Sequence, residues 1–310
     1  MAPQTLSELI ERARTDDVCR VALAGAENEV ALSALAEAAQ RQLAESVLVG
    51  DESAIRRLID GLPVSGEGLQ RTARFIPARD PDEAAQKAVQ AVRDGDADLL
   101  MKGALRTDQL LRAVLDRERG LRTDRLLSDV LIYEDELSGA TRLVGLTDGG
   151  VNVAPDREAK AQIIRNAVDV FHRLGVERPK IALMSATEAV TDAIPSTLDA
   201  QHLTQRADEG AFGDCQVYGP LALDNALLAW AAQAKGIDSP VAGRADVMVV
   251  PSIEAGNLLG KAVKYFGNST CAHVIMGARA PVLIPSRVES VDDKLSSIAL
   301  GALMVRECRR

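Results

Sequence analysis

The sequence predicts an α/β protein with mainly parallel sheets, organised as two domains. Short apolar runs alternate with longer amphipathic segments along the chain, which is the pattern of strands and helices in βα units. Only 3% of the residues are aromatic, and Ala, Leu and Val fill the apolar positions, as expected where helices pack on parallel sheets. With 310 residues the chain is too long for one small core, which favours two domains.

The first part of the chain alternates regularly between strand and helix. Strands are expected at 20–24, 46–50, 74–77 and 97–102. Helices are expected at 28–45, 52–61, 81–95 and 108–116. The third of these helices opens with Pro and Asp in its first turn, and Thr107 is expected to cap the fourth.

The alternation changes near Leu126. Two strands at 127–133 and 141–146, joined by a short connection, are typical of an antiparallel pair. The remaining elements are expected as a helix at 155–174, strands at 180–184, 245–250 and 281–285, and a final helix at 290–305.

The domain boundary is expected near 148–153, and the last helix is expected to return to the first domain. Residues 1–149 and 284–310 would then form one α/β/α domain, and residues 150–283 the other.

Charge and composition argue against several classes of function. The chain has 36 basic and 45 acidic residues, a formal charge of −9, and no basic stripe mixed with aromatic residues, which disfavours nucleic-acid binding. Because the molecule as a whole repels anions, an anionic ligand would need a local group of arginines.

Neither a metal site nor a membrane segment is expected. The three histidines are scattered, and the cysteines lack the paired spacing of a metal site, lying at Cys19, Cys215, Cys271 and Cys308. No apolar run reaches the length of a membrane span, and the N-terminus does not have the pattern of a signal peptide. We therefore expect a cytoplasmic protein without membrane contact.

The turn after the strand at 97–102 is a candidate anion site. Gly103 permits a tight turn between Lys102 and Arg106, and the N–H groups at the start of the next helix would add donors. On spacing alone, an ordinary βα turn with solvated charges fits equally well.

A second candidate is the glycine-rich turn that contains Asp148, Gly149, Gly150 and Asn152. Such a turn allows the backbone to approach a ligand closely, and it fits a structural hinge between domains equally well.

A third candidate follows the strand at 245–250, where Ser252 is a predicted N-cap followed by Glu254 and Asn257. The segment from Gly256 to Lys261 resembles a phosphate loop only superficially. Its glycines are one residue too close for a Walker motif, and Ala262 replaces the hydroxyl residue that would bind magnesium. These departures argue against an NTPase, and the lack of a G-x-G-x-x-G pattern disfavours a Rossmann dehydrogenase.

The fourth candidate lies where the strand at 281–285 gives way to the last helix. Ser286, Arg287 and Asp293 bring a hydroxyl, a guanidinium and a carboxylate to the end of a strand, where open α/β sheets bind ligands. The structural alternative is a capping box, in which Asp293 only accepts a bond from the main-chain N–H of Ser290.

Four ordered segments resemble the phosphate acetyltransferase/phosphate butyryltransferase family. They are Thr-Asp-Gly-Gly-Val-Asn-Val-Ala-Pro at 147–155, Gly-Pro-Leu-Ala-Leu-Asp-Asn at 219–225, Val-Pro-Ser-Ile-Glu-Ala-Gly-Asn at 250–257 and Ala-Pro-Val-Leu-Ile-Pro-Ser-Arg at 280–287. The resemblance covers nearly the full length and is strongest from Asp148 onward. The first two segments are more similar to the butyryltransferase branch.

The resemblance implies a reversible reaction in which acyl-CoA and inorganic phosphate give acyl phosphate and coenzyme A. It also implies two α/β/α domains related in fold to isocitrate and isopropylmalate dehydrogenases, an active site in the cleft between them, and a homodimer. Coenzyme A is then a substrate, and neither a tightly bound cofactor nor a metal is expected.

The resemblance assigns roles to individual residues. Ser286 and Arg287 would bind phosphate and stabilise the tetrahedral intermediate, and Asp293 would be the base for the CoA thiol, with Asp292 or Glu289 as substitutes. The residues expected to contact substrate are Lys102, Arg106, Asp148, Asn152, Glu254 and Asn257. Which of Arg106, Arg112 and Arg122 meets the phosphates of coenzyme A is left open.

Two other functions remain open at this point. The chain could sense acyl-CoA without catalysis, as similar domains do in some malic enzymes. It could also be a metal- and nicotinamide-dependent decarboxylating dehydrogenase, which would need a set of carboxylates around magnesium. The sequence does not distinguish acetyl, propionyl and butyryl substrates, because one methylene changes discrimination by only about 1–3 kcal/mol.

Overall fold

The computed structural model describes residues 2–15, 17–62 and 66–306. By its internal contacts the chain divides into two compact units. We call Ser7–Arg125 and the segment from Ala272 onward the terminal unit, and Leu126–Cys271 with the segment up to Leu6 the central unit. A division by contacts is not the same as a division into folding domains, so the domain boundaries expected from the sequence stay a prediction.

The terminal unit has a mainly parallel sheet. Its strands lie in the order β3-β2-β1-β4-β11-β10, and the β11–β10 pair is antiparallel whereas the pairs from β3 to β11 are parallel. The strands are β1 (Cys19–Ala24), β2 (Ala44–Gly50), β3 (Arg74–Pro77), β4 (Leu99–Lys102), β10 (Cys271–Met276) and β11 (Val282–Leu283). Its helices are α1 (Leu6–Ala13), α2 (Glu29–Gln40), α3 (Glu52–Asp60), α4 (Glu67–Thr72), α5 (Pro81–Arg93), α6 (Thr107–Val114) and α12 (Val291–Arg306).

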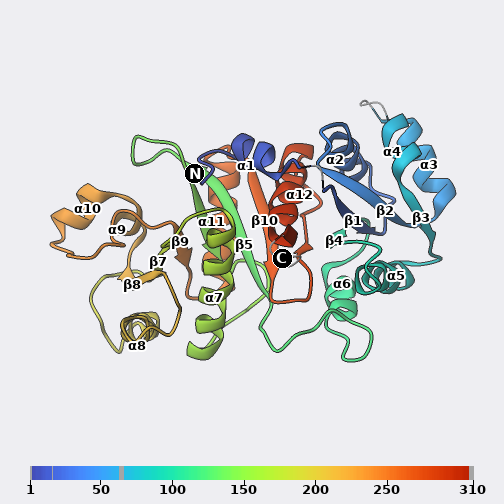
Figure 1. Ribbon diagram of the computed structural model, residues 1–310. Coiled ribbons are helices and arrows are strands. Elements are labelled where there is room, and N and C mark those ends of the chain that lie inside the picture. Colours follow the sequence, from blue (N-terminus) through green and yellow to red (C-terminus); the bar gives the residue numbers. More distant parts are fainter. Residues whose placement is uncertain (1, 16, 63–65, 307–310) are drawn as a thin grey trace. The chain divides into compact units, whose positions relative to one another are not determined.

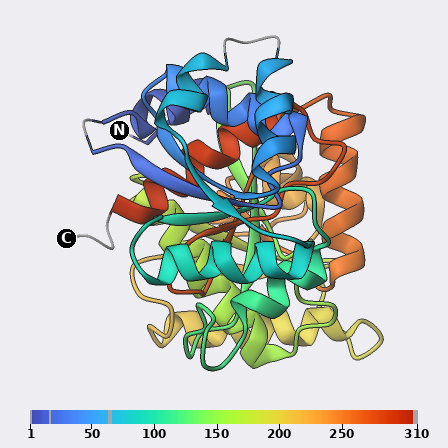
Figure 2. The ribbon, with the colours of Figure 1, turned by 90° about the vertical axis from the view of Figure 1, so that its right-hand side faces the viewer.

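Helices cover both faces of this sheet. Helices α2 and α12 pack on each other and on one face, while α5 and α6 pack on each other at the opposite face (Figure 1). Figure 2 turns this unit toward the viewer, with α5 in teal. The alanine-rich face of α5 (Ala84, Ala85, Ala88 and Ala91) is buried, which lets the helix lie close to the strands.

The central unit also has a mainly parallel sheet. Its strand order is β5-β6-β9-β7-β8, with β5–β6 antiparallel and the other neighbouring pairs parallel. The strands are β5 (Ser128–Asp135), β6 (Arg142–Thr147), β7 (Lys180–Met184), β8 (Gln216–Leu221) and β9 (Val247–Val249). The helices are α7 (Arg157–Arg173), α8 (Pro195–Asp208), α9 (Leu223–Leu227), α10 (Ala229–Ala234) and α11 (Ile253–Tyr265).

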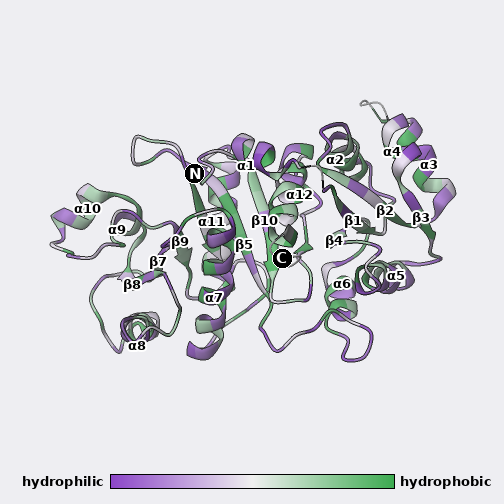
Figure 3. Ribbon diagram, viewed as in Figure 1, coloured by the Kyte–Doolittle hydropathy of each residue, from purple (hydrophilic) through white to green (hydrophobic). Residues whose placement is uncertain are grey.

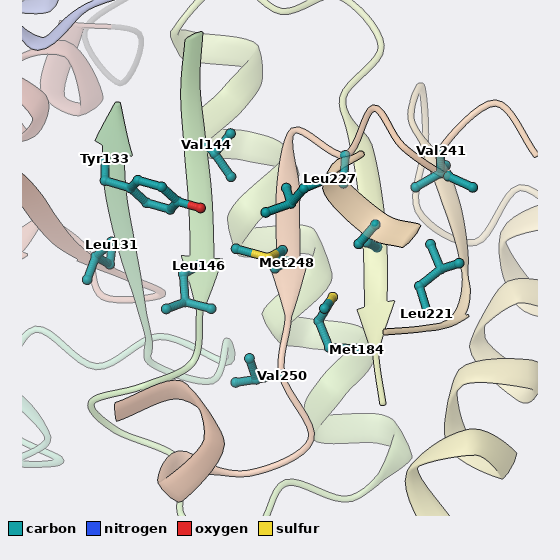
Figure 4. Close-up of a cluster of buried hydrophobic side chains, with 14 of the residues drawn as sticks. Leu131, Tyr133, Val144, Leu146, Met184, Leu221, Leu227, Val241, Met248 and Val250 are labelled. Carbon is teal, nitrogen blue, oxygen red and sulfur yellow. The ribbon is translucent and has the colours of Figure 1, made fainter. Parts of the chain in front are cut away.

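Strand β6 shows how side chains of this sheet are distributed between its two faces. Val144 and Leu146 belong to a buried cluster that includes residues of α9 and α10 and against which α11 packs (Figure 4). Gly145, between them, faces α7, where an added Cβ would lie 2.8 Å from the ring of Phe171. Alternation along the strand thus buries both faces, and the middle of the neighbouring strand β5 likewise has hydrophobic colouring in Figure 3.

The fold class predicted from the sequence, α/β with mainly parallel sheets, is confirmed, as is the antiparallel pair near Leu126. Two local predictions were wrong. The helix predicted to reach residue 45 ends at Gln40, because Ala44 already pairs with Cys19 in the sheet. Thr107 is the first residue of α6 and not its cap, since extended Arg106 takes the N-cap position and donates its N–H to the side chain of Gln109.

Among the described residues Cys19, Cys215 and Cys271 form no disulfide, and Cys308 lies outside those residues. In the part of the chain that the structure describes, no helix combines the length and apolar character needed to cross a membrane.

Candidate active site

Strands β4 and β11 end side by side at the carboxyl edge of the terminal unit's sheet. They are parallel neighbours, with Val282 opposite Leu100 and Leu283 opposite Met101. Lys102, the last residue of β4, and the residues that follow β11 therefore emerge at the same edge. This register brings together two of the candidates that lie far apart in the sequence.

The residues after β11 form a closed turn at 286–289. The N–H of Glu289 donates to the carbonyl oxygen of Ser286 at 3.3 Å, and the N–H of Ser286 donates to Oε1 of Glu289 at 2.9 Å. Lys294 Nζ, in the first turn of α12, donates to the carbonyl oxygens of Ser286 at 3.1 Å and Glu289 at 2.9 Å. The conformation of the turn is therefore set by hydrogen bonds at both of its ends.

The turn leaves a set of donors without partners. Within the described ranges, neither the hydroxyl of Ser286 nor the N–H and guanidinium of Arg287 makes a hydrogen bond. Both residues are exposed. An anion at this turn could accept bonds from a hydroxyl, an amide and a guanidinium without displacing a protein partner.

Lys102 adds a buried positive charge to this edge. The residue is only 5% exposed, and its ammonium has no hydrogen-bond partner among the residues described. Burial lowers the pKa of Lys102, the positive charges of Arg287 and Lys294 lower it further, and Glu289 opposes the shift. Cations that destabilise each other are stabilised by a bound anion, so the cluster is suited to hold one.

The turn that follows Lys102 packs closely against the backbone of the turn after β1. The N–H of Gly103 donates to the carbonyl oxygen of Ala24 at 2.8 Å, and the N–H of Ala104 donates to that of Gly25 at 2.6 Å. A Cβ on Gly103 would collide with the carbonyl oxygen of Gly25. Only glycine allows the turns after β1 and β4 to approach this closely.

Asp293 lies in the capping box that the sequence suggested. It is fully buried, and its Oδ2 accepts from the N–H of Ser290 at 2.8 Å and from the hydroxyl of Ser290 at 2.7 Å. Asp292 is exposed. The Glu289 side chain is 12% exposed, and its Oε2 is buried without a hydrogen-bond partner in the described segments.

Arg106 is held by a neighbouring carboxylate. Its Nε and Nη2 donate to the two oxygens of Asp108 at 2.8 and 2.6 Å, and Arg112 reaches the same carboxylate at 3.4 Å. Both arginines and Arg122 are exposed. An anionic substrate would compete with Asp108 for the first two.

In the central unit, Asp148 organises the loop at 148–152. Its Oδ1 accepts from the N–H groups of Gly150 at 2.8 Å and Val151 at 2.9 Å, and its Oδ2 accepts from the N–H and side chain of Asn152 at 3.2 and 2.5 Å. Burial raises the pKa of Asp148, and the nearby charge of Asp129 raises it further. Both carboxylate oxygens of Asp148 therefore accept hydrogen bonds from the loop to which this residue belongs.

The 148–152 loop lies against the start of α11. Asn257 Nδ2 donates to the carbonyl oxygen of Gly149 at 3.3 Å, and a Cβ on Gly149 would lie 2.9 Å from the main-chain carbon of Gly256. Ser252 caps α11 as predicted, and Glu254 is exposed in its first turn. The structure thus groups Asp148, Asn152 and Asn257 at the carboxyl edge of this sheet, with Glu254 one turn away.

Residues 75–302 match the model of a protein family described as "Phosphate acetyl/butaryl transferase". The chain belongs to this family. A probable phosphate butyryltransferase of Bacillus subtilis is 40% identical over 96% of the chain and 96% of its own length. A phosphate acetyltransferase of Rhizobium meliloti is 38% identical over 97% of the chain and 93% of its own length.

A protein of known structure has a similar fold. The crystal structure of a branched-chain phosphotransacylase from Enterococcus faecalis matches 93% of the chain and 99% of its own length, with a TM-score of 0.80 and 29% identity. The matched family segment contains Lys102, the 148–152 loop and the 286–289 turn.

Sequence reasoning missed Lys294 as a partner of the turn and gave Glu289 a different role. A lysine eight residues after Ser286 falls in the first turn of a helix, where it usually remains in solvent, and only its burial marks it as part of this arrangement. Asp129 beside Asp148 was also missed, because the two are neighbours only through the pairing of β5 with β6.

Proposed function

We propose that this chain interconverts acyl-CoA plus inorganic phosphate and acyl phosphate plus coenzyme A. The observation that carries the proposal is a set of donors on Lys102, Ser286 and Arg287 that make no hydrogen bond to any described residue, in a member of this transferase family. Phosphate is a compact anion with several acceptor oxygens, and such donors match it in charge and number. Coenzyme A acts as a substrate and leaves after each turnover.

Ser286, Arg287 and Lys102 bind phosphate and direct one of its oxygens at the thioester carbonyl carbon. The new C–O bond gives a tetrahedral carbon whose oxyanion is stabilised by the same donors. The C–S bond then breaks, the acyl phosphate forms, and CoA leaves as a thiolate that takes up a proton. In the reverse direction the thiol must lose that proton before sulfur attacks.

Asp293 is the base that receives the thiol proton, by way of Ser290. The Asp293 carboxylate is buried, whereas Ser290 is exposed and donates its hydroxyl proton to Oδ2 at 2.7 Å. The thiol proton moves to the Ser290 oxygen while the hydroxyl proton moves to Asp293. A thiol pKa of about 8.5 means that a modest base is enough.

Arg106, Asp148, Asn152, Glu254 and Asn257 are proposed to contact acyl-CoA. Asn257 and Glu254 are exposed near the N-terminus of α11, so their side chains are open to a ligand. Asp148 and Asn152 lie in the 148–152 loop, and the hydrogen bonds between them set the shape in which the loop would meet the ligand. The chain is further proposed to work as a homodimer, which light scattering of the purified protein would establish.

The decisive experiment is thioester formation from acyl phosphate and coenzyme A in the presence of a chelator. Turnover supports the proposal. Binding of acyl-CoA without turnover would favour the acyl-CoA sensor, and activity only with a divalent cation and a nicotinamide cofactor would favour the dehydrogenase.

Acyl-chain preference is the finer part of the proposal. Butyryl-CoA is expected to be the better substrate, because the segments at 147–155 and 219–225 are more similar to the butyryltransferase branch. The similar identities to a butyryl and an acetyl enzyme, 40% and 38%, do not favour either chain length. Equal kcat/KM values for acetyl-, propionyl- and butyryl-CoA would contradict the preference.

A further inference from the structure

Lys294 is a buried cation that the reaction scheme above does not use. It lies in the first turn of α12 with 2% of its surface exposed. Its ammonium donates to two main-chain oxygens of the 286–289 turn, those of Ser286 and Glu289. A buried ammonium is stable only where its protons are accepted, so these bonds hold the two carbonyls toward α12.

The direction of the Ser286 carbonyl sets the direction of the next amide. The peptide between Ser286 and Arg287 is trans, and in a trans peptide the carbonyl and the following N–H point in opposite directions. Because the Ser286 carbonyl points at Lys294, the N–H of Arg287 points away from Lys294. That N–H makes no hydrogen bond to any residue that the structure describes.

Glu289 fixes the same residue from its other side. Its Oε1 accepts from the Ser286 N–H at 2.9 Å, and its own N–H donates to the Ser286 carbonyl at 3.3 Å. Both main-chain groups of Ser286 are thus bonded to the protein. What remains for a ligand is the hydroxyl of Ser286 and the donors of Arg287.

Lys294 also adds charge where an anion would bind. It is close enough to Lys102 to lower the pKa of that lysine, as Arg287 does. The protein thus keeps three cations at one sheet edge, of which Lys294 is directed at the main chain of the turn.

We propose that Lys294 is a positioning residue for phosphate. It holds the Ser286 carbonyl inward, so that the Arg287 N–H and the Ser286 hydroxyl face the phosphate. This inference rests on the proposed function and extends it to a residue that does not itself touch the substrate.

The test compares Lys294→Met with Lys294→Arg. Lys294→Met keeps most of the length of the side chain and removes its donors, and it is expected to raise the KM for phosphate about 10- to 100-fold, as small misplacements of binding groups do. The KM for acyl-CoA should change by less than about threefold, because only the turn is disturbed. The Lys294→Arg protein should keep most of the phosphate affinity of the unaltered protein, since a guanidinium can donate to both carbonyls.

Lys87→Met is the matched control. Lys87 lies in the same unit and also donates to a main-chain carbonyl, that of Pro77 at 2.6 Å, but its side chain is 40% exposed and pairs with Glu83. Both KM values should stay at those of the unaltered protein. A purely structural role of Lys294 would lower the melting temperature and leave the two KM values in their original ratio, and that result would overturn the inference.

A second variant covers the case in which Lys294→Met does not fold. Glu289→Ala removes the acceptor of the Ser286 N–H, and it should produce the same selective rise in the phosphate KM. Protection against thermal unfolding by inorganic phosphate alone provides a readout without catalysis. Unaltered phosphate protection in a folded variant overturns the inference, whereas absence of acyl transfer by the unaltered protein overturns the proposed function.

Discussion

The 148–152 loop and the 286–289 turn begin from similar positions in their sheets. Each follows a buried strand at the carboxyl edge, and each carries polar residues there. In the 148–152 loop the functional groups bind one another, because Asp148 accepts from three main-chain N–H groups and from the side chain of Asn152.

The 286–289 turn uses its polar groups differently. Glu289 and Lys294 make the bonds that hold the main chain, and the side chains of Ser286 and Arg287 make no hydrogen bond in the portion of the chain that the structure describes. The difference teaches that residue type alone does not separate a residue that holds a loop from one that binds a ligand. What separates them is whether the protein already satisfies their hydrogen-bonding groups.

The largest effect is expected for Arg287→Ala, which tests the binding side of this comparison. Loss of the guanidinium should reduce kcat/KM by about 10²- to 10³-fold, or about 2.7–4 kcal/mol, by analogy with loss of an oxyanion donor. Stability should hardly change, because the side chain is exposed and makes no hydrogen bond within the described residues. Steady-state kinetics and thermal unfolding of the same preparation measure both quantities.

The matched control is Arg71→Ala, which removes another exposed arginine of the terminal unit, at the end of α4. It should leave kcat/KM unchanged. Full acyl transfer by the Arg287→Ala protein would remove Arg287 from the mechanism.

Asp148→Ala tests the holding side and should show the opposite pattern. It leaves four donors of the 148–152 loop without their acceptor, which should lower the free energy of unfolding by about 1–3 kcal/mol. The loss is moderated because the carboxylate is buried beside Asp129, an arrangement that raises its pKa. Urea unfolding measures the effect, and a variant as stable as the unaltered protein would contradict the structural role assigned to this carboxylate.

The sequence predicted the βα alternation well because apolar runs and caps are local signals. Strand β7 and strand β3 have the predicted bounds, and Ser252 caps α11 as expected. The error at the end of α2 has a non-local cause. The alanine-rich segment favours a helix by its local propensity, but Ala44 pairs with Cys19 of β1 and therefore belongs to strand β2.

The candidate site was predictable only in part for a related reason. Ser286 and Arg287 stand out as polar residues after a strand, but the parallel pairing of β4 with β11 that puts Lys102 beside them is not encoded locally. The role of Lys294 depends on the direction of one carbonyl group in a turn. Spacing in a sequence carries no information on that direction.

A smaller effect is expected on the pH dependence of phosphate binding, to which Lys102 contributes. Because burial lowers its pKa, the ammonium is lost at a lower pH than in an exposed lysine, whose pKa is about 10.4. As pH rises through this lowered pKa, phosphate binding should weaken, which gives kcat/KM for phosphate an alkaline limb. Lys102→Arg should move that limb to higher pH, because arginine keeps its proton. A limb at the same pH in both proteins would assign it to another group.

The smallest effect is expected for Asp129→Asn, which tests how much the charge of Asp129 contributes to the raised pKa of Asp148 in the 148–152 loop. Removing the Asp129 charge should lower the pKa of Asp148, leaving burial as the main cause of its shift. A carboxyl whose pKa is raised by folding binds more protons in the folded than in the unfolded state, so stability falls as pH rises from the ordinary pKa through the raised one. Asp129→Asn should reduce that fall.

Asp246→Asn is the control for this measurement, because burial also raises the pKa of Asp246 but its charged neighbours are Lys180 and Arg142. Carbon-detected NMR titration of the Asp148 carboxyl should show a lowered pKa in Asp129→Asn and an unchanged one in Asp246→Asn. If neither variant moves the Asp148 pKa, burial alone accounts for it. The pKa of Asp148 would then be shifted by burial and not by a like charge. In that respect the 148–152 loop would differ more clearly from the cluster of Lys102, Arg287 and Lys294, whose like charges shift the pKa of Lys102.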